Sequence, residues 1–227
     1  MVSTFPWQAV VFDLDGTLLD TSALYTEATK TTFPELGADG WVQFGRRIGQ
    51  AIDHYGVPGC ASPLGIEEEV LRAWIRQWYL VPPEVIQPFP DAASILTELS
   101  SAGVRCALNT NRPQEQVVVR ELLQNYGLHS FLDPVVTSAM VGVKKPDPAG
   151  LFEVCRLMEV RPADCLFVGD SIADMQSGRN AGVRTIGVTT GMFGREELLD
   201  HGAWLVVDCL ADVCSVVGER GWLGQAN

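Results

Sequence analysis

The chain has 227 residues, of which 47% are hydrophobic and 19% are charged. These proportions are typical of a folded globular protein and argue against extensive disorder. Lys and Arg number 16 and Asp and Glu number 28, so the formal net charge is −12 at pH 7. This balance argues against a broad nucleic-acid-binding surface, because such surfaces neutralise phosphates with basic side chains. An anionic ligand would need a bound cation or local basic side chains to offset the field.

Targeting signals are not evident in the sequence. No apolar segment is long enough to span a membrane, and the opening MVSTFPWQAVVFDLDG lacks the basic and long apolar regions of a signal peptide. We therefore expect a cytoplasmic protein. None of the six cysteines forms a C-x-x-C pair, and Cys106 and Cys165 lie within apolar runs. We expect these thiols to be structural rather than metal-binding or redox-active.

Short apolar runs rich in β-branched residues alternate with helical stretches through most of the chain. Gln8–Asp13 is the first such run, and it ends in a turn-forming Asp-Leu-Asp-Gly cluster. Continuous apolar runs are typical of buried parallel strands, and alternation with helices predicts a parallel sheet covered on both faces. Further strands are expected at 104–109, 134–137, 165–169, 184–189 and 203–208. Helices are expected at 91–102, 113–126, 148–159, 173–181 and 195–201.

The interval from Thr21 to Gln87 breaks this alternation, because it contains no convincing strand pattern. Gly56–Gly65 is interpreted as a breaker-rich loop, and Val81–Pro90, with its four prolines, as a stiff return connection. Helical patterns appear in the rest of the interval, near 21–33, 40–55 and 66–80.

The simplest account of this interval is an insertion after the first strand of an α/β core. The sequence therefore predicts a Rossmann-like, doubly wound parallel sheet built from residues 1–18 and 88–227. An all-helical cap domain is expected at residues 19–87.

Polar side chains follow the predicted strands at their carboxyl ends, where open α/β sheets bind ligands. They are Asp13, Asp15, Thr110-Asn111, Lys144-Lys145, Asp170-Ser171 and Asp174. Two carboxylates about 4 Å apart repel by about 4 kcal/mol at an effective dielectric constant of about 20, so a proton or a cation must relieve the repulsion. Oxygen ligands without His or Cys nearby favour Mg2+. A Mg2+ ion held by a few carboxylates is typical of a phosphoryl-transfer site.

Gly16 and Thr17 follow the first two of these carboxylates. Glycine lets the backbone turn tightly beside a ligand, and the N–H groups of such a turn can bind an oxyanion. An ordinary turn is the alternative interpretation of Asp-x-Asp-Gly-Thr. Its combination with Gly-Asp-Ser-x-x-Asp at 169–174, after another apolar strand, favours a functional site.

Four segments resemble the four motifs of the haloacid dehalogenase-like superfamily, in the family's order. They are FDLDGTLLD at 12–20, NTN at 109–111, KPDP at 145–148 and VGDSIAD at 168–174. The predicted helical insertion resembles the family's C1 cap, and GRNAG at 178–182 is similar to phosphoglycolate phosphatase-like members. The resemblance spans most of the chain.

The resemblance implies a role for each acidic residue. Asp13 would be the nucleophile that takes the phosphoryl group. Asp15 would protonate the leaving alcohol and then activate water, because the second half-reaction reverses the need for a proton. Asp13, the backbone carbonyl of Asp15, and Asp170 would hold Mg2+. Asp174 would orient Lys145 or lie just outside the direct ligands of the metal.

The same resemblance implies which residues bind the substrate. Thr110, the backbone near Asn111, and the turn at Gly16 would bind the transferring phosphoryl group. Lys145, rather than its neighbour Lys144, would neutralise negative charge on that group and on Asp13.

Three arginines bear on the substrate. Arg46 and Arg47 lie in the predicted cap, where they contact the leaving group of the substrate or occupy a solvated helix face. Arg112 follows Thr110-Asn111, at a position where many phosphoglycolate phosphatases have Lys. This difference does not affect the expected catalytic residues, but it weakens any inference about which phosphomonoester is the natural substrate.

The resemblance implies a Mg2+-dependent phosphatase that hydrolyses a small phosphomonoester through an aspartyl-phosphate. The alternatives are a β-phosphoglucomutase-like sugar phosphomutase, a haloacid dehalogenase and a non-catalytic binding module. A dehalogenase needs neither Mg2+ nor the acid at Asp15, and a binding module would be marked by the loss of a ligand or nucleophile. The expected partner is a small phosphorylated metabolite, with no nucleic acid and no membrane, and the protein is expected to be a monomer or a homodimer.

Overall fold

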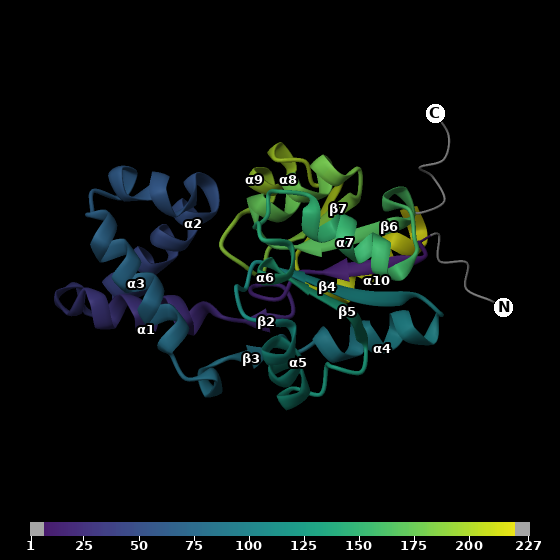
Figure 1. Ribbon diagram of the computed structural model, residues 1–227, viewed down its shortest axis with the longest axis horizontal. Coiled ribbons are helices and arrows are strands. Elements are labelled where there is room, and N and C mark those ends of the chain that lie inside the picture. The colour runs from purple at the N-terminus through teal and green to yellow at the C-terminus, as the bar shows by residue number, and fades with distance from the viewer. Residues whose placement is uncertain (1–6, 221–227) are drawn as a thin grey trace. The chain divides into compact units, whose positions relative to one another are not determined.

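The computed structural model describes residues 7–220 (Figure 1). Its internal contacts divide the chain into two compact units. The larger unit takes the residues up to Leu18 and those from Pro88 onward, and the smaller unit takes Leu19–Gln87. Within the described part of the chain, no helix combines the length and the apolar content needed to cross a membrane.

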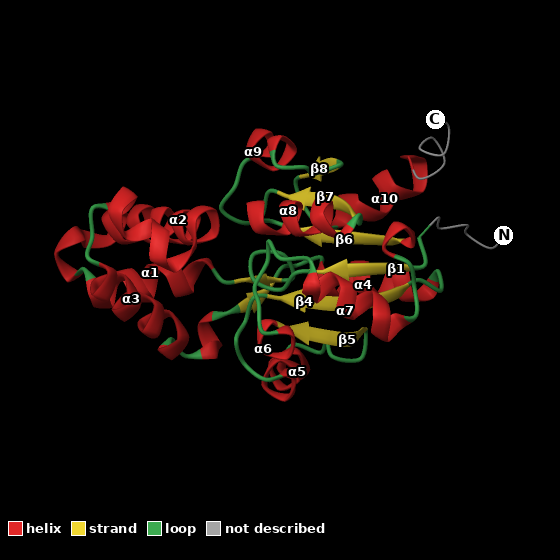
Figure 2. Ribbon diagram, turned by 45° about the horizontal axis from the view of Figure 1, so that its top comes forward, coloured by secondary structure: helices red, strands yellow, loops and turns green. Residues whose placement is uncertain are grey.

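The larger unit is built on a sheet of six parallel strands in the order β5-β4-β1-β6-β7-β8 (Figure 2). From β1 the chain adds β4 and β5 towards one edge of the sheet. It then crosses over and adds β6, β7 and β8 towards the other edge, which is the doubly wound arrangement that the sequence predicts. The predicted fold class is therefore confirmed. The strands are β1 (Ala9–Phe12), β4 (Arg105–Thr110), β5 (Leu132–Thr137), β6 (Cys165–Gly169), β7 (Arg184–Val188) and β8 (Leu205–Val207).

Helices cover the sheet and bury its apolar side chains. Val11 and Phe167 on the strands pack with Leu151 and Val154 of α7 in one buried cluster. Figure 1 shows α4 and α5 on the opposite side of the sheet from α7. The helices of this unit are α4 (Ala92–Ser101), α5 (Gln116–Asn125), α6 (Ser138–Val141), α7 (Ala149–Met158), α8 (Ile172–Ala181), α9 (Arg195–Asp200) and α10 (Ala211–Arg220). Burial on both faces explains why the strands are apolar throughout.

Three of these helices differ from the sequence-based expectation. α5 begins at Gln116 rather than at 113, because the preceding loop is held by Ser138, whose hydroxyl donates to the carbonyls of Asn111 and Arg112 at 3.0 Å each. The sequence did not predict α6 or α10. α6 is a four-residue turn, too short to show a helical period.

The smaller unit is helical, with a core centred on Trp74. This side chain is 2% exposed, and its indole N–H donates to the hydroxyl of Thr29 at 2.9 Å. Tyr25 and Trp78 pack around it, so the tryptophans belong to the core of this unit. The helices are α1 (Ser22–Thr32), α2 (Gly37–Leu64) and α3 (Glu68–Leu80), with 3-10 turns at Pro34–Leu36 and Pro83–Val85.

The predicted loop at Gly56–Gly65 is wrong. The chain kinks at Gly56, with φ 69° and ψ 166°, and continues as a helix until the left-handed Gly65. Only glycine readily adopts the backbone conformation at the kink. Cys60 and Leu64 lie in the continuing segment and pack against the core of the unit. Tertiary packing therefore overrides the breaker-rich composition.

Two short strands lie where the units join. β2 (Leu19–Asp20) and β3 (Gln87–Pro88) form a two-stranded sheet that the sequence did not predict. Next to it, the backbone N–H of Phe89 donates to the carbonyl of Leu18 at 3.0 Å. The outgoing and returning segments of the chain are thus hydrogen-bonded to each other.

Candidate active site

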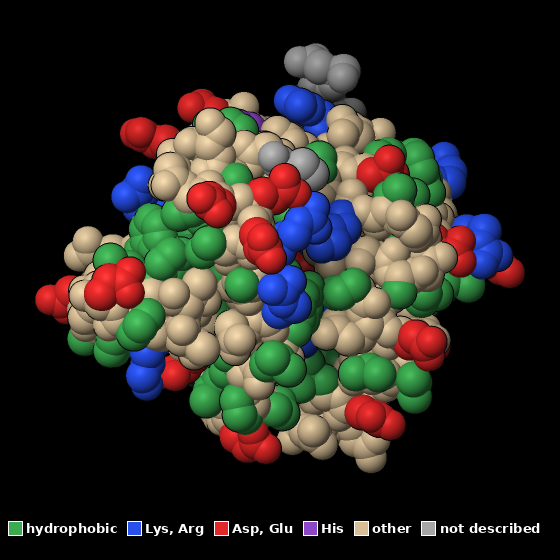
Figure 3. Space-filling model, turned by 60° about the vertical axis from the view of Figure 1, so that its left-hand side comes forward, with side chains coloured by type: hydrophobic (Ala, Val, Ile, Leu, Met, Phe, Trp, Pro, Cys, Tyr) green, Lys and Arg blue, Asp and Glu red, His purple; other side chains and the backbone are tan. Residues whose placement is uncertain are grey.

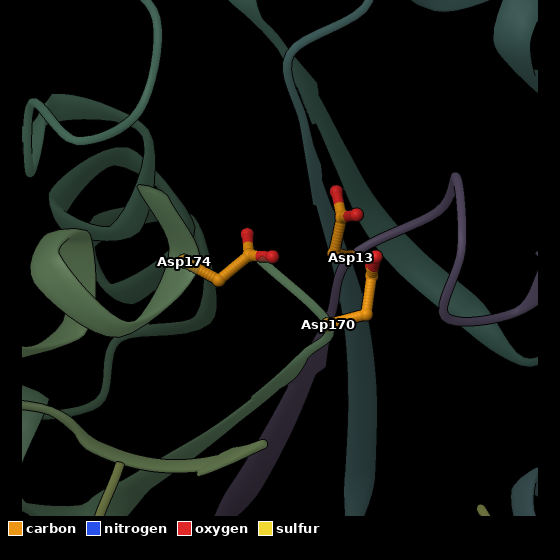
Figure 4. A group of neighbouring side chains, drawn as sticks. All are labelled: Asp13, Asp170 and Asp174. Carbon is orange, nitrogen blue, oxygen red and sulfur yellow. The ribbon is translucent and has the colours of Figure 1, made fainter. Parts of the chain in front are cut away.

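Three buried carboxylates gather at the carboxyl end of the parallel sheet. Asp13 follows β1, Asp170 follows β6, and Asp174 lies in the first turn of α8. The pairing of β1 with β6 extends one residue beyond the strand, because the N–H of Asp13 donates to the carbonyl of Val168 at 2.9 Å. Figure 4 shows the three carboxylates facing one another, and each offers an oxygen within 4.8 Å of the others. The sheet therefore brings together residues that lie far apart in the sequence.

Lys145 joins this acidic cluster as a buried cation. Its ammonium donates to Asp13 Oδ1 at 2.5 Å, to Asp174 Oδ1 at 2.6 Å and to the carbonyl of Asn109 at 3.2 Å. The side chain of Asn111 holds the backbone of Lys145, because its Oδ1 accepts the Lys145 N–H at 2.7 Å and its Nδ2 donates to the Lys145 carbonyl at 3.4 Å. The neighbouring Lys144 is exposed. This geometry selects Lys145 as the lysine of the cluster.

Asp174 is held by protein donors on both of its carboxylate oxygens. Oδ1 accepts from Lys145, and Oδ2 accepts from the N–H and the hydroxyl of Ser171 at 3.0 and 2.7 Å. The Ser171 hydroxyl also accepts the N–H of Asp174, which completes a capping box at the start of α8. Because both oxygens are engaged, the geometry favours a role in orienting Lys145 over direct contact with a metal.

Burial and repulsion between neighbouring carboxylates raise the pKa values of Asp13 and Asp170. Burial raises the pKa of Asp13 to about 7, and the negative charges of Asp174 and Asp15 act in the same direction, whereas the attraction of Lys145 opposes them. Burial and the charge of Asp13 also raise the pKa of Asp170 well above its ordinary value. Burial alone would lower the pKa of Lys145, but the adjacent carboxylates outweigh it and raise that pKa. One lysine therefore does not offset the carboxylates.

Asp170 fits the role of a metal ligand. Its carboxylate accepts a hydrogen bond from the Thr17 hydroxyl at 2.8 Å, yet no Lys or Arg whose side chain the structure describes forms an ion pair with it. The side chain is 4% exposed, so water alone does not stabilise its charge. The possible metal ligands in the cluster are all carboxylate oxygens, from Asp13, Asp170 and Asp174. Such a set suits a hard divalent cation such as Mg2+.

Asp15 lies beside the cluster in a two-pronged ion pair with Arg112. The guanidinium donates through Nε to Asp15 Oδ2 at 2.8 Å and through Nη2 to Asp15 Oδ1 at 2.6 Å. Both side chains are largely buried, with 11% of Arg112 and 17% of Asp15 exposed. The sequence does not predict this contact, since the two residues lie 97 positions apart. The motif residue Asp15 therefore has a partner that no local pattern reveals.

The remaining predicted ligands of the phosphoryl group lie on the two loops beside the cluster. Thr110 is 2% exposed at the end of β4, and its hydroxyl oxygen accepts the N–H of Arg112 at 3.2 Å. The side chain of Asn111 holds Lys145, and its backbone carbonyl accepts from the hydroxyl of Ser138. Gly16 has φ +86° and forms the turn after Asp15.

Arg46 and Arg47 belong to the smaller unit, whereas every member of the acidic cluster belongs to the larger unit. Both arginines are exposed on α2, and the guanidinium of Arg47 lies 5.7 Å from the ring centre of Phe44. Their contact with a substrate stays a prediction. Two other carboxylates have local roles. Asp20 accepts the N–H of Ser22 at the start of α1, and Asp147 accepts the N–H of Ala149 at the start of α7.

The buried aspartates and Lys145 lie at the carboxyl edge of a doubly wound parallel sheet, the edge at which α/β proteins of this class bind their ligands. The sequence profile of haloacid dehalogenase-like hydrolases matches residues 10–188. The chain belongs to this family, and within it to the phosphoglycolate phosphatase-like members, so it is a phosphatase. The predicted resemblance and enzyme class are confirmed.

Relatives cover most of the chain. It is 31% identical to phosphoglycolate phosphatase of Pseudomonas savastanoi pv. phaseolicola over 215 residues, which cover 88% of this chain and 76% of the relative. Phosphoglycolate phosphatase of Vibrio vulnificus is 29% identical, over 92% of this chain and 95% of the relative. Among solved structures, a hydrolase from Pseudomonas syringae superposes with a TM-score of 0.74 at 21% identity, over 93% of this chain and 98% of that one. This structural likeness supports the fold.

Proposed function

We propose that the protein is a Mg2+-dependent phosphatase that hydrolyses a small phosphomonoester through an aspartyl-phosphate on Asp13. The observation that carries this proposal is the convergence of Asp13, Asp170 and Asp174 around one point, with Lys145 on one side of it. Phosphoryl transfer depends mainly on positioning and on stabilising charge. A buried nucleophile beside a buried ammonium meets both requirements.

Two half-reactions follow from this arrangement. In the first, a carboxylate oxygen of Asp13 bonds to phosphorus while the ester P–O bond breaks, and the departing alkoxide takes a proton from Asp15. In the second, a water molecule bonds to phosphorus and gives its proton to Asp15, and the bond between phosphorus and Asp13 breaks. Inorganic phosphate and the alcohol are the products, and both aspartates return to their starting states.

The residues that would hold Mg2+ are Asp13, Asp170 and the backbone carbonyl of Asp15. When bound, the ion supplies positive charge that stabilises the phosphoryl oxygens during transfer. Asp174 keeps the ammonium of Lys145 in place on the other side of Asp13.

Substrate recognition is divided between the two units in this proposal. The Thr110 hydroxyl, the Asn111 backbone and the turn at Gly16 bind the phosphoryl group. Residues 19–87 act as a helical cap that selects the leaving group, with Arg46 and Arg47 as its contacts. The net charge of −12 supports a small ligand over a nucleic acid. On the face that Figure 3 shows, acidic side chains lie near basic ones.

Phosphoglycolate is the first substrate to test, because the matched relatives are phosphoglycolate phosphatases. We propose a cytoplasmic location, since all six cysteines are free thiols and cytoplasmic proteins keep cysteines reduced. A monomer or a homodimer is proposed for the assembly.

A panel of phosphomonoesters tests the function. The purified protein is incubated with phosphoglycolate, sugar phosphates, nucleotides or an aryl phosphate, with Mg2+ and then with a chelator. We expect release of inorganic phosphate that stops when Mg2+ is removed. Transfer of phosphate back to a sugar, dependent on a bisphosphate primer, would instead identify a phosphomutase. Activity on 2-haloacids after complete metal removal would identify a dehalogenase.

Mg2+ is expected to stabilise the protein more as pH rises. The pKa of Asp13 is about 7 in the metal-free folded state against 3.8 ordinarily, so between these values the folded protein holds a proton that the unfolded chain has lost. The contribution of Asp13 to the stability of the metal-free protein therefore falls as pH rises towards 7. Because Mg2+ needs ionised carboxylates, its binding displaces this proton and strengthens with pH.

The measurement is the rise in Tm caused by saturating Mg2+, compared at about pH 5.5 and about pH 8 by differential scanning calorimetry. The larger rise is expected at the higher pH. Asp170→Asn is the control, since it should reduce the Mg2+ effect at both values. An equal rise at both pH values in the unmodified protein would contradict the assignment of Asp13 as a ligand.

Arg112→Ala is expected to lower kcat by about 10- to 100-fold, because Asp15 loses the two hydrogen bonds that orient its carboxylate. Proton transfer by a positioned acid or base contributes about 100-fold or more. Arg112→Lys should recover only part of the loss, since an ammonium cannot make the two-pronged contact. Arg120→Ala is the matched control, because Arg120 forms an exposed ion pair with Asp133. The measurement is kcat from steady-state kinetics. An undiminished kcat in Arg112→Ala would show that Arg112 does not orient Asp15 for catalysis.

A further inference from the structure

A loop that contains none of the recognised motifs closes one side of the acidic cluster. It connects β7 to α9 and includes Thr190 and Gly191. A Cβ atom placed on Gly191 would lie 2.5 Å from Cγ and 2.8 Å from Cβ of Asp170, distances that real side chains do not adopt. Gly191 is not among the residues with positive φ, so its backbone would accept alanine. The requirement for glycine here is space for the carboxylate of Asp170.

The turn after Asp15 makes a second close approach to the same carboxylate. Gly16 has φ +86°, and a Cβ atom there would lie 2.7 Å from Cγ of Asp170. The hydroxyl of Thr17 donates to Asp170 Oδ1 at 2.8 Å. The carboxylate is thus enclosed by two glycines and held by one hydroxyl.

The two enclosing loops are tied to each other. The hydroxyl of Thr190 donates to the carbonyl of Gly16 at 2.6 Å, although the residues lie 174 positions apart in the sequence. This hydrogen bond fixes the spacing between the backbones at Gly16 and Gly191. The space left for the carboxylate of Asp170 depends on the spacing between these two glycines.

We propose that Thr190 and Gly191 are positioning residues that set the orientation of Asp170 for cation binding. The proposal rests on the proposed function, in which Asp170 is a ligand of Mg2+. Mg2+ demands near-ideal geometry from its ligands, and groups that orient a metal ligand typically change metal affinity by about 10- to 100-fold. The carboxylate of Asp170 is 4% exposed, lies against Gly16 and Gly191 and is held by Thr17, so it has little room to turn when the backbone at either glycine shifts.

Gly191→Ala tests this role through Mg2+ binding measured by isothermal titration calorimetry, without substrate. The dissociation constant is expected to rise by about 10- to 100-fold. Gly194→Ala is the matched control in the same loop, since a Cβ atom there would meet only Glu197 Oε2 at an ordinary 3.5 Å. Its affinity should stay within about twofold of the unmodified protein. Unchanged affinity in Gly191→Ala would overturn the proposal.

Thr190 provides a second pair of variants that does not depend on the new methyl group being tolerated. Thr190→Val keeps the shape but removes the donor to Gly16, and it should weaken Mg2+ binding several-fold. Thr190→Ser keeps the hydroxyl and should bind Mg2+ as the unmodified protein does. Equal affinities for the two variants would show that the hydrogen bond does not position Asp170.

A double-variant cycle separates this inference from the proposed function. In metal-free protein, Gly191→Ala should lower Tm when Asp170 is present and should have little further effect in an Asp170→Gly background, because both the obstructing carboxylate and the Cβ atom of residue 170 are gone. Equal losses of Tm in both backgrounds would overturn the inference. If the unmodified protein bound no Mg2+, the proposed function would fail, whereas the cycle would still decide whether Gly191 orients Asp170.

Discussion

Asp13→Asn is expected to lower turnover by about 10,000-fold or more, a loss typical of removing a nucleophile. The amide has nearly the same shape as the carboxylate, but it does not attack phosphorus and it brings no charge to the cation site. Lys145 keeps its contact with Asp174, so the variant should remain folded. Turnover is measured as release of inorganic phosphate, and folding is checked by circular dichroism.

Asp133→Asn is the matched control for this experiment. Asp133 is an exposed aspartate of the same unit, and its only ion pair among the described residues is with Arg120. Exposed pairs contribute little to stability, so this variant should keep full turnover. The proposed mechanism fails if Asp13→Asn also keeps full turnover, since the carboxylate of Asp13 would then not be required to carry the phosphoryl group.

Asp15→Asn is expected to slow both half-reactions by about 100- to 10,000-fold, the usual contribution of a positioned acid or base. The loss of rate in the first half-reaction should depend on the leaving group of the substrate, whereas the loss in the second should not. An aryl phosphate has a good leaving group that needs little help from an acid, whereas the later attack of water still needs a base. The phosphorylated form of Asp13 should therefore accumulate with an aryl phosphate.

Acid quenching followed by mass spectrometry detects that species, and rapid-quench kinetics should show a burst of the aryl alcohol. Asp20→Asn serves as the comparison, because Asp20 accepts the N–H of Ser22 at the start of α1 and takes no part in the proposed chemistry. A uniform loss of rate with every leaving group, and no trapped phosphoenzyme, would exclude Asp15 as the base.

The architecture could be predicted because its signals are local. Buried parallel strands are continuous apolar runs, and the polar residues that end them stand out against that background. Asp13 and Asp170 could therefore be assigned to one edge of a sheet before any coordinates were known. The helical segment after Gly56 could not be predicted, since its stability comes from packing that its composition does not reveal.

The contacts that orient the candidate site could not be predicted for a different reason. Arg112 meets Asp15 across 97 positions, and Thr190 meets Gly16 across 174. Such pairs leave no periodic or spaced pattern in a single sequence. The residues that carry the chemistry follow strands directly, whereas those that hold them in place depend on the complete fold.

The hydrogen bond between Phe89 and Leu18 has a consequence for how such enzymes diversify. The inserted segment leaves and re-enters the catalytic body at a single closed junction, so its length and composition can change without disturbing the strands on either side. Under the proposed division of labour, new substrate preferences can arise in the insert while the phosphate chemistry is inherited intact.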